Sequence, residues 1–75
     1  MNNERRKHIR ELQVRIEDIT NDLDAIASDE EDYLNNMPEN LQGSERSEQS
    51  EAAVDALKEA SEAISSASSD LDDIL

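Results

Sequence analysis

The chain has 75 residues, no cysteine and a formal net charge of −13 at pH 7, with 20 acidic against 7 basic residues. This length allows at most one small domain, and the lack of cysteine excludes disulfides and thiolate metal sites. No apolar run approaches the roughly 20 residues that span a bilayer. No apolar segment follows the basic N-terminus, as it would in a secretory signal. We therefore expect a cytoplasmic protein.

The charge is distributed unevenly along the chain. Residues 1–15 carry five basic and two acidic side chains, a net +3, whereas residues 16–75 carry two basic and eighteen acidic ones, a net −16. Such an acidic body repels nucleic acid and anionic lipid and attracts basic protein surfaces. Tyr33 is the only aromatic residue, so platforms for stacking bases are absent. We expect a basic protein as the partner, and neither nucleic acid nor a membrane.

A first long helix is predicted over residues 3–36. Its apolar side chains recur at alternating steps of three and four, the heptad pattern of helices that pack against each other. They are Ile9, Leu12, Ile16, Ile19, Leu23 and Ile26, and the same count continues through Glu30 to Tyr33 and Met37. Asn2 or Asn3 can cap the start of this helix. Pro38 disfavours helical geometry at the residue before it, so the helix is expected to end near residue 36.

A second helix is predicted over residues 44–74, with Ser44 as its N-cap. Its heptad stripe is thinner, because it consists of Ala53, Leu57, Ala60, Ile64, Ala67, Leu71 and Ile74. The turn between the helices, residues 37–43, contains the only proline and the only glycine of the chain. Seven residues suit a connection between antiparallel neighbours. The fold class is therefore all-α, a single antiparallel two-helix hairpin.

Three details of this hairpin can be predicted. The acidic segment 28–31 is where a kink or fraying is expected, and Leu41 is expected to fill the closed end. Antiparallel pairing is expected to bring Arg5, Arg6, Lys7 and Arg10 beside Asp70, Asp72 and Asp73. A two-helix seam rich in alanine buries little apolar surface, so the isolated monomer could also be disordered. We therefore expect a homodimer, most simply a four-helix bundle.

Residues for catalysis or metal binding are scarce. His8 is the only histidine and falls in the first turn of a helix, where an exposed side chain is expected. A carboxylate needs a water-poor pocket to act as a general acid or base, and a hairpin offers none. No segment has the aspartate and glycine spacing of a calcium loop. We expect no enzyme activity, no cofactor and no specific metal site.

The outward faces of both helices carry rows of carboxylates. On the second helix they are Glu48, Glu51, Asp55, Glu59 and Glu62, and on the first Asp18, Asp22, Asp29 and Asp32. Side chains one helical turn apart are about 5–6 Å apart, a spacing of the same order as that of phosphates along DNA. One interpretation is that Glu48, Glu51, Asp55, Glu59, Glu62, Asp18 and Asp22 bind a protein built to hold DNA. The other is that these carboxylates only solvate the surface.

Two segments of the sequence are distinctive: Asn-Met-Pro-Glu-Asn-Leu-Gln-Gly-Ser-Glu, residues 36–45, and Glu-Ala-Ala-Val-Asp-Ala-Leu, residues 51–57. With these segments and its basic start, the chain resembles, over nearly its whole length, small and largely uncharacterised proteins of phages and prophages of Gram-positive bacteria. Residues 37–45 are the most specific part of this resemblance. The resemblance implies a phage context, in which small acidic proteins inhibit host enzymes such as uracil-DNA glycosylase or CRISPR effectors. Glu59–Ile64 would supply carboxylates beside an apolar surface in such an inhibitor.

Two functions therefore remain open. The first is an inhibitor or modulator that binds a DNA-handling host protein through its carboxylates and imitates DNA. The second is a structural or assembly protein whose function is self-association. In the second case the working residues would be Ile16, Ile19, Leu23, Leu57, Ile64 and Leu71.

Overall fold

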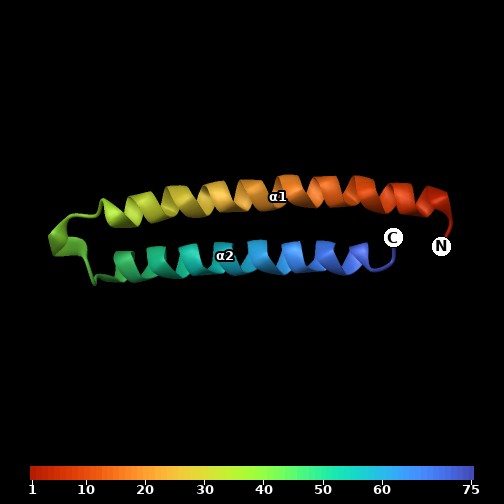
Figure 1. Cartoon of the computed structure of the whole chain (residues 1–75). Helices are drawn as coiled ribbons and strands as arrows, with labels where there is room; N and C mark the ends of the chain where they lie inside the picture. The colour runs from red at the N-terminus through yellow and green to blue at the C-terminus, as the bar shows by residue number, and fades with distance from the viewer.

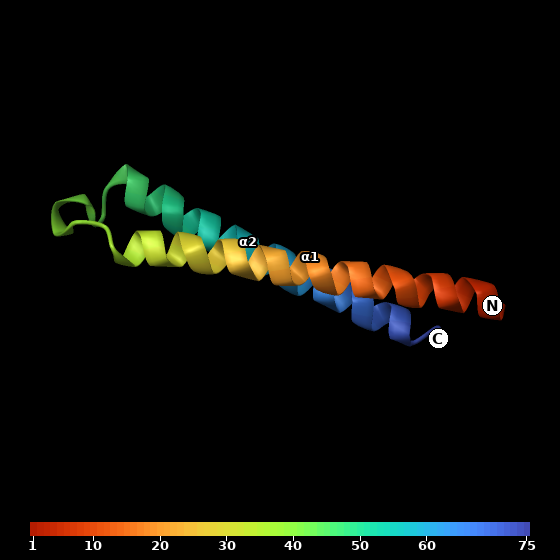
Figure 2. The same ribbon diagram turned by 90° about the horizontal axis from the view of Figure 1, so that it is seen from above.

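The computed structural model describes all residues 1–75 and contains two long helices joined by a short turn. Helix α1 spans Asn3–Asn35, the 3₁₀ turn η1 spans Glu39–Leu41, and helix α2 spans Glu45–Asp72. The helices run antiparallel and side by side (Figure 1) and cross at a shallow angle (Figure 2). The predicted all-α antiparallel hairpin is confirmed. Neither helix combines the length and apolarity needed to cross a membrane.

Local signals explain where each helix begins. The Asn2 side chain accepts a hydrogen bond from the backbone N–H of Arg5 at 2.8 Å, and Ser44 accepts one from the N–H of Ser47 at 3.3 Å. Both bonds satisfy donors that the first turn of a helix leaves unpaired. Gly43 adopts a φ of 77°, in the left-handed region that favours glycine, and so allows the chain to turn into α2.

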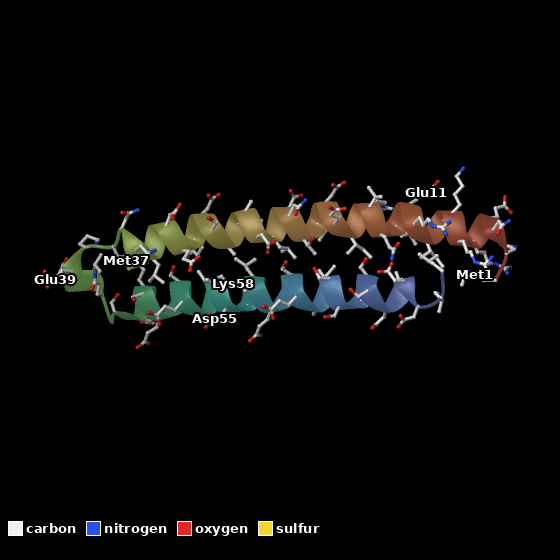
Figure 3. The ribbon with its side chains drawn as sticks, in the orientation of Figure 1. Met1, Glu11, Met37, Glu39, Asp55 and Lys58 are labelled. Carbon is white, nitrogen blue, oxygen red and sulfur yellow. The ribbon has the colours of Figure 1, made fainter.

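Two predictions about the hairpin's weak points are wrong. Helix α1 runs without interruption through residues 28–31, because Glu30 is half-buried and its carboxylate accepts a hydrogen bond from Ser50 Oγ at 2.7 Å. The closed end is filled by Met37, which is buried between the helix ends, whereas Leu41 is only half-buried. Figure 3 shows Met37 beneath the end of α1 and Glu39 at the tip of the turn.

The seam between the helices is rotated relative to the predicted one. The positions Ile9, Ile16 and Leu23 of α1 and Leu57, Ile64 and Leu71 of α2 are half-buried against the other helix, as expected. The second position of each heptad, however, is one residue later than predicted. The residues that occupy it are Gln13, Thr20, Ala27 and Leu34 on α1, and Val54, Ser61, Ser68 and Leu75 on α2.

Small side chains explain this rotation. Thr20, Ala27, Ser50 and Ser61 are buried, and a seam of small residues lets two helix backbones approach closely. Thr20 Oγ1 donates to the Glu17 carbonyl of its own helix at 2.9 Å, and Ser50 Oγ donates across the seam to Glu30. No buried side-chain polar atom lacks a partner. Close packing and satisfied polar groups thus hold the hairpin although no large apolar side chain is fully buried.

Because of this rotation, the residues predicted for the second position of each heptad lie outside the seam. Leu12, Ile19, Ile26 and Tyr33 form a row at seven-residue intervals along α1, and Ala53, Ala60, Ala67 and Ile74 form the equivalent row along α2. Ile19, Ile26, Tyr33 and Ile74 are 49%, 54%, 47% and 47% exposed. In an antiparallel pair, equivalent heptad positions flank the seam on the same side. These two rows therefore form one continuous apolar face of the hairpin.

Candidate functional site

The other flank of the seam is polar and is called here the charged face. Its residues are Arg10, Glu17, Asp24 and Glu31 on α1, and Glu51, Lys58, Ser65 and Asp72 on α2. Lys58 Nζ lies 3.2 Å from Glu31 Oε1, the one ion pair of the structure, and its members are each about half exposed. Each open hollow between the helices is lined in part by residues of this face, and the one near the turn includes Glu51. None of the hollows includes a residue of the apolar face.

Polar contacts on this side fix the register of the two helices. Gln13 Nε2 donates to the carbonyl of Ser68 at 3.0 Å and to Asp72 Oδ1 at 2.7 Å. At the other end Ser50 is level with Glu30, to which it donates. Interpolating between the Gln13–Ser68 and Glu30–Ser50 contacts places residues 20–21 of α1 level with Ala60 of α2.

The basic segment at the start of α1 is not paired as predicted. Helix α1 has 33 residues and α2 has 28, so the first turns of α1 extend beyond the end of α2, by about 7 Å at 1.5 Å per residue. Figure 1 shows this overhang at the open end. None of the four predicted basic residues, Arg5, Arg6, Lys7 and Arg10, makes an ion pair with Asp70, Asp72 or Asp73, although Arg10 lines the same hollow as Asp72. Asp72 instead accepts a hydrogen bond from Gln13.

The predicted partner-binding carboxylates are all exposed. Glu48, Glu51, Asp55, Glu59 and Glu62 form a row on the outward side of α2, called here the carboxylate row, and none makes an ion pair. Figure 3 shows Asp55 on the side of α2 that faces away from α1. Asp18 and Asp22 are exposed on α1 and are likewise unpaired. Because α1 and α2 carry them on separate outward sides, Asp18 and Asp22 do not extend the row of α2.

The remaining candidate chemistry is sparse. His8 is exposed and lines an open hollow on the overhang together with Arg5, Lys7 and Glu11. No three His, Asp or Glu side chains converge on a point where they could hold a metal ion.

The site that sequence reasoning missed is the apolar face. Its residues were expected to be covered by the other helix of the hairpin. A signal was present in the second half of α1, where the residues three and four places after Leu23 are both apolar, Ile26 and Ala27, as are Tyr33 and Leu34 one heptad later. An apolar stripe of this width is more than one partner helix covers. Comparison with known proteins adds no relative, because no protein-family model, no curated protein and no solved structure matches the chain.

Proposed function

We propose that this chain is a small acidic protein-interaction module that binds a basic protein surface through the carboxylate row of α2. The observation that supports this proposal is the excess of unpaired charge. The chain has 20 acidic side chains, of which only Glu31 is in an ion pair. All five members of the row are exposed along one side of a regular helix. Their charge is available to an external partner.

The geometry of the row favours a target that normally holds DNA. A helix presents side chains one turn apart at about 5–6 Å, and a DNA strand carries one phosphate per about 3.4 Å of helix axis. A rigid helix can therefore present a linear series of negative charges to the basic side chains of a partner. Because the helix backbone is already ordered, binding does not carry the entropic cost of ordering it. Since α2 continues through 28 residues without a break, the row is preorganised for binding.

The resemblance to phage proteins suggests the class of target. We propose a DNA-handling protein of a bacterial host, of the kind that uracil-DNA glycosylase inhibitors and anti-CRISPR proteins block, with the bacterial cytoplasm as the place of action. Binding to such a protein would be driven by charge. It should therefore weaken as salt rises, and DNA should compete with it.

The test is a pull-down from a Gram-positive bacterial lysate with three variants, read by mass spectrometry at low and high salt. The first bait is the unmodified chain. The second reverses three carboxylates of the row: Glu51→Lys, Asp55→Lys and Glu59→Lys. The third makes the same total charge change outside the row: Glu11→Lys, Asp29→Lys and Asp73→Lys. Circular dichroism verifies that all three baits are equally helical.

The proposal predicts a DNA-handling protein that the unmodified and third baits retain at low salt, that DNA displaces, and that the second bait loses. Equal retention by all three baits would show that the row is not the binding surface. Equal loss by the second and third baits would show that total charge, and not the row, determines binding.

A second function is favoured by a different observation, the exposure of the apolar face. A structural or assembly protein would use this face to associate with itself. Of the residues proposed for that role, Ile16, Leu23, Leu57, Ile64 and Leu71 pack within the hairpin, whereas Ile19 remains half exposed. In this reading, substitutions on the apolar face abolish function and reversal of the carboxylate row does not.

A further inference from the structure

We propose that the apolar face binds the apolar face of a second copy of the chain, with the two turns at opposite ends of the resulting four-helix bundle. A twofold axis would pass close to Ile19 of α1 and Ala60 of α2. This proposal does not depend on the carboxylate row, which would remain on the outside of the bundle.

The exclusion of acidic residues indicates that the apolar face is covered. Continuing each row by one heptad toward the start of its helix reaches Arg5 on α1 and Arg46 on α2. No acidic residue therefore occupies either row, although the chain has 20 of them among 75 residues. A surface meant only for solvent would not be kept free of carboxylates in so acidic a chain. Exposed apolar patches of this kind mark protein interfaces.

The surface area of the hairpin matches what a dimer needs. The accessible surface is 5603 Å². A globular monomer of 8.4 kDa would expose about 4,600 Å² by the usual scaling with mass. The excess is of the order of the roughly 800 Å² per partner that a standard protein interface buries. No large side chain is fully buried within one hairpin, so the apolar face is the main apolar surface left to bury.

Charge selects the orientation of the second copy. Residues 29–51, around the turn, carry eight acidic side chains and one basic one. The open end carries the overhanging Arg5, Arg6 and Lys7, which make no ion pair within the hairpin. Placing the turns at the same end would bring these two acidic regions together and the two basic overhangs together. Placing them at opposite ends brings each basic overhang beside the acidic turn of the other copy, which is favourable.

The register of the hairpin allows this arrangement with a single axis. In an antiparallel pair of α1 helices, the row from Arg5 to Tyr33 is centred on Ile19. In an antiparallel pair of α2 helices, the row from Arg46 to Ile74 is centred on Ala60. The polar contacts of the hairpin place residues 20–21 level with Ala60, so the two centres lie within about two residues of each other, or about 3 Å along the helix. One twofold axis can thus pair Leu12 with Ile26 of the second copy and Ala60 with its own equivalent.

Cysteine cross-linking tests this arrangement, because the chain contains no cysteine of its own. The variant Ala60→Cys places two thiols at the proposed axis, where alanine-lined helices approach closely enough for a disulfide. The matched control is Ala52→Cys, an exposed residue of the same helix on its outward side. Both variants are oxidised at equal concentration, and covalent dimers are measured by non-reducing electrophoresis. Circular dichroism before oxidation confirms that both variants are equally helical.

The proposal predicts that Ala60→Cys chains join at least about tenfold faster than Ala52→Cys chains, since the axis holds two thiols at a high effective concentration. Equal rates would overturn it. A mixture of Ala60→Cys and Ile19→Cys chains separates the two orientations, because Ile19 is the residue of the α1 row nearest to the level of Ala60. If these two variants join to each other while Ala60→Cys chains fail to join among themselves, the turns lie at the same end and the proposed orientation is wrong. A monomeric mass for the unmodified chain at about 1 mM would overturn the interface itself.

Discussion

The apolar face and the charged face border the same seam and are built from the same two helices, yet their chemistry is opposite. Seven of the eight residues of the charged face are ionisable. The two rows of the apolar face contain no charged residue, and the first charged position beyond each row is an arginine, Arg5 on α1 and Arg46 on α2. The charged face contains open hollows and the ion pair of Lys58 with Glu31. The charged side chains are therefore distributed unevenly around the hairpin.

The largest effect is expected when an acidic residue is introduced on the apolar face. We expect Ile26→Glu to weaken self-association at least about 100-fold, because each dimer would bury two carboxylates without partners. The control is Val14→Glu, which introduces the same side chain at a residue of α1 that is 60% exposed and lies outside both faces. Sedimentation equilibrium gives both dissociation constants. Equal dissociation constants for the two variants would mean that the apolar face stays in solvent.

The seam that both faces share should control the stability of the hairpin. Met37 is buried at the closed end, so Met37→Ala is expected to lower the free energy of unfolding by about 2 kcal/mol and Tm by about 10 °C. The control, Met1→Ala, removes an exposed side chain and should change stability by less than about 0.5 kcal/mol. Thermal unfolding followed by circular dichroism measures both. A similar Tm for the two variants would show that the closed end is not packed in solution.

The sequence was enough to predict the hairpin but not the residues of its seam. Heptad spacing, the proline and glycine of the turn, and the caps at Asn2 and Ser44 were enough to predict the hairpin and its approximate helix ends. The identity of the seam was not predictable in this way. Periodicity ranks positions by apolar character, so it selected Ile19 and Ile26, whereas two helices in close contact favour small residues such as Ala27 and Ser61.

The pairing of charges was less predictable than the fold. Antiparallel pairing of two helices of equal length would bring the basic start of α1 beside the aspartates at the end of α2. In the structure α1 is five residues longer than α2, so the basic residues extend beyond these aspartates. This difference depends on where each helix stops, and helix ends are the least certain feature of a sequence pattern. The carboxylate row, in contrast, follows directly from helical periodicity, and all its residues are exposed as the spacing implies.

Salt distinguishes the apolar face from the carboxylate row, because it should strengthen self-association through the apolar face and weaken binding through the carboxylate row. Each copy carries a net charge of −13, so screening reduces the repulsion between copies. We expect self-association to tighten about threefold to tenfold between about 0.02 M and about 0.5 M NaCl. Over the same range, binding of the carboxylate row to a basic probe such as polylysine should weaken. Isothermal titration and sedimentation follow the two processes, and a change of both in the same direction would contradict separate roles for the two surfaces.

The smallest effect is expected for the ion pair of the charged face. Lys58 and Glu31 are each about half exposed, so Lys58→Ala should change the free energy of unfolding by less than about 1 kcal/mol. Arg15→Ala removes an exposed basic side chain from α1 that makes no ion pair, and serves as the reference for the loss of one positive charge. Chemical unfolding of both variants gives the difference. A loss well above this range for Lys58→Ala alone would mean that the charged face, too, is buried in solution.

The most direct test of the different roles of the two faces is the mass of the unmodified chain in solution. Sedimentation equilibrium from about 1 μM to about 1 mM covers the range in which an interface of standard size forms. Coverage of the apolar face by a second copy predicts a concentration-dependent rise to twice the 8.4 kDa of one chain, with no larger species. A mass of 8.4 kDa throughout would show that the apolar face remains open to solvent and would contradict the account.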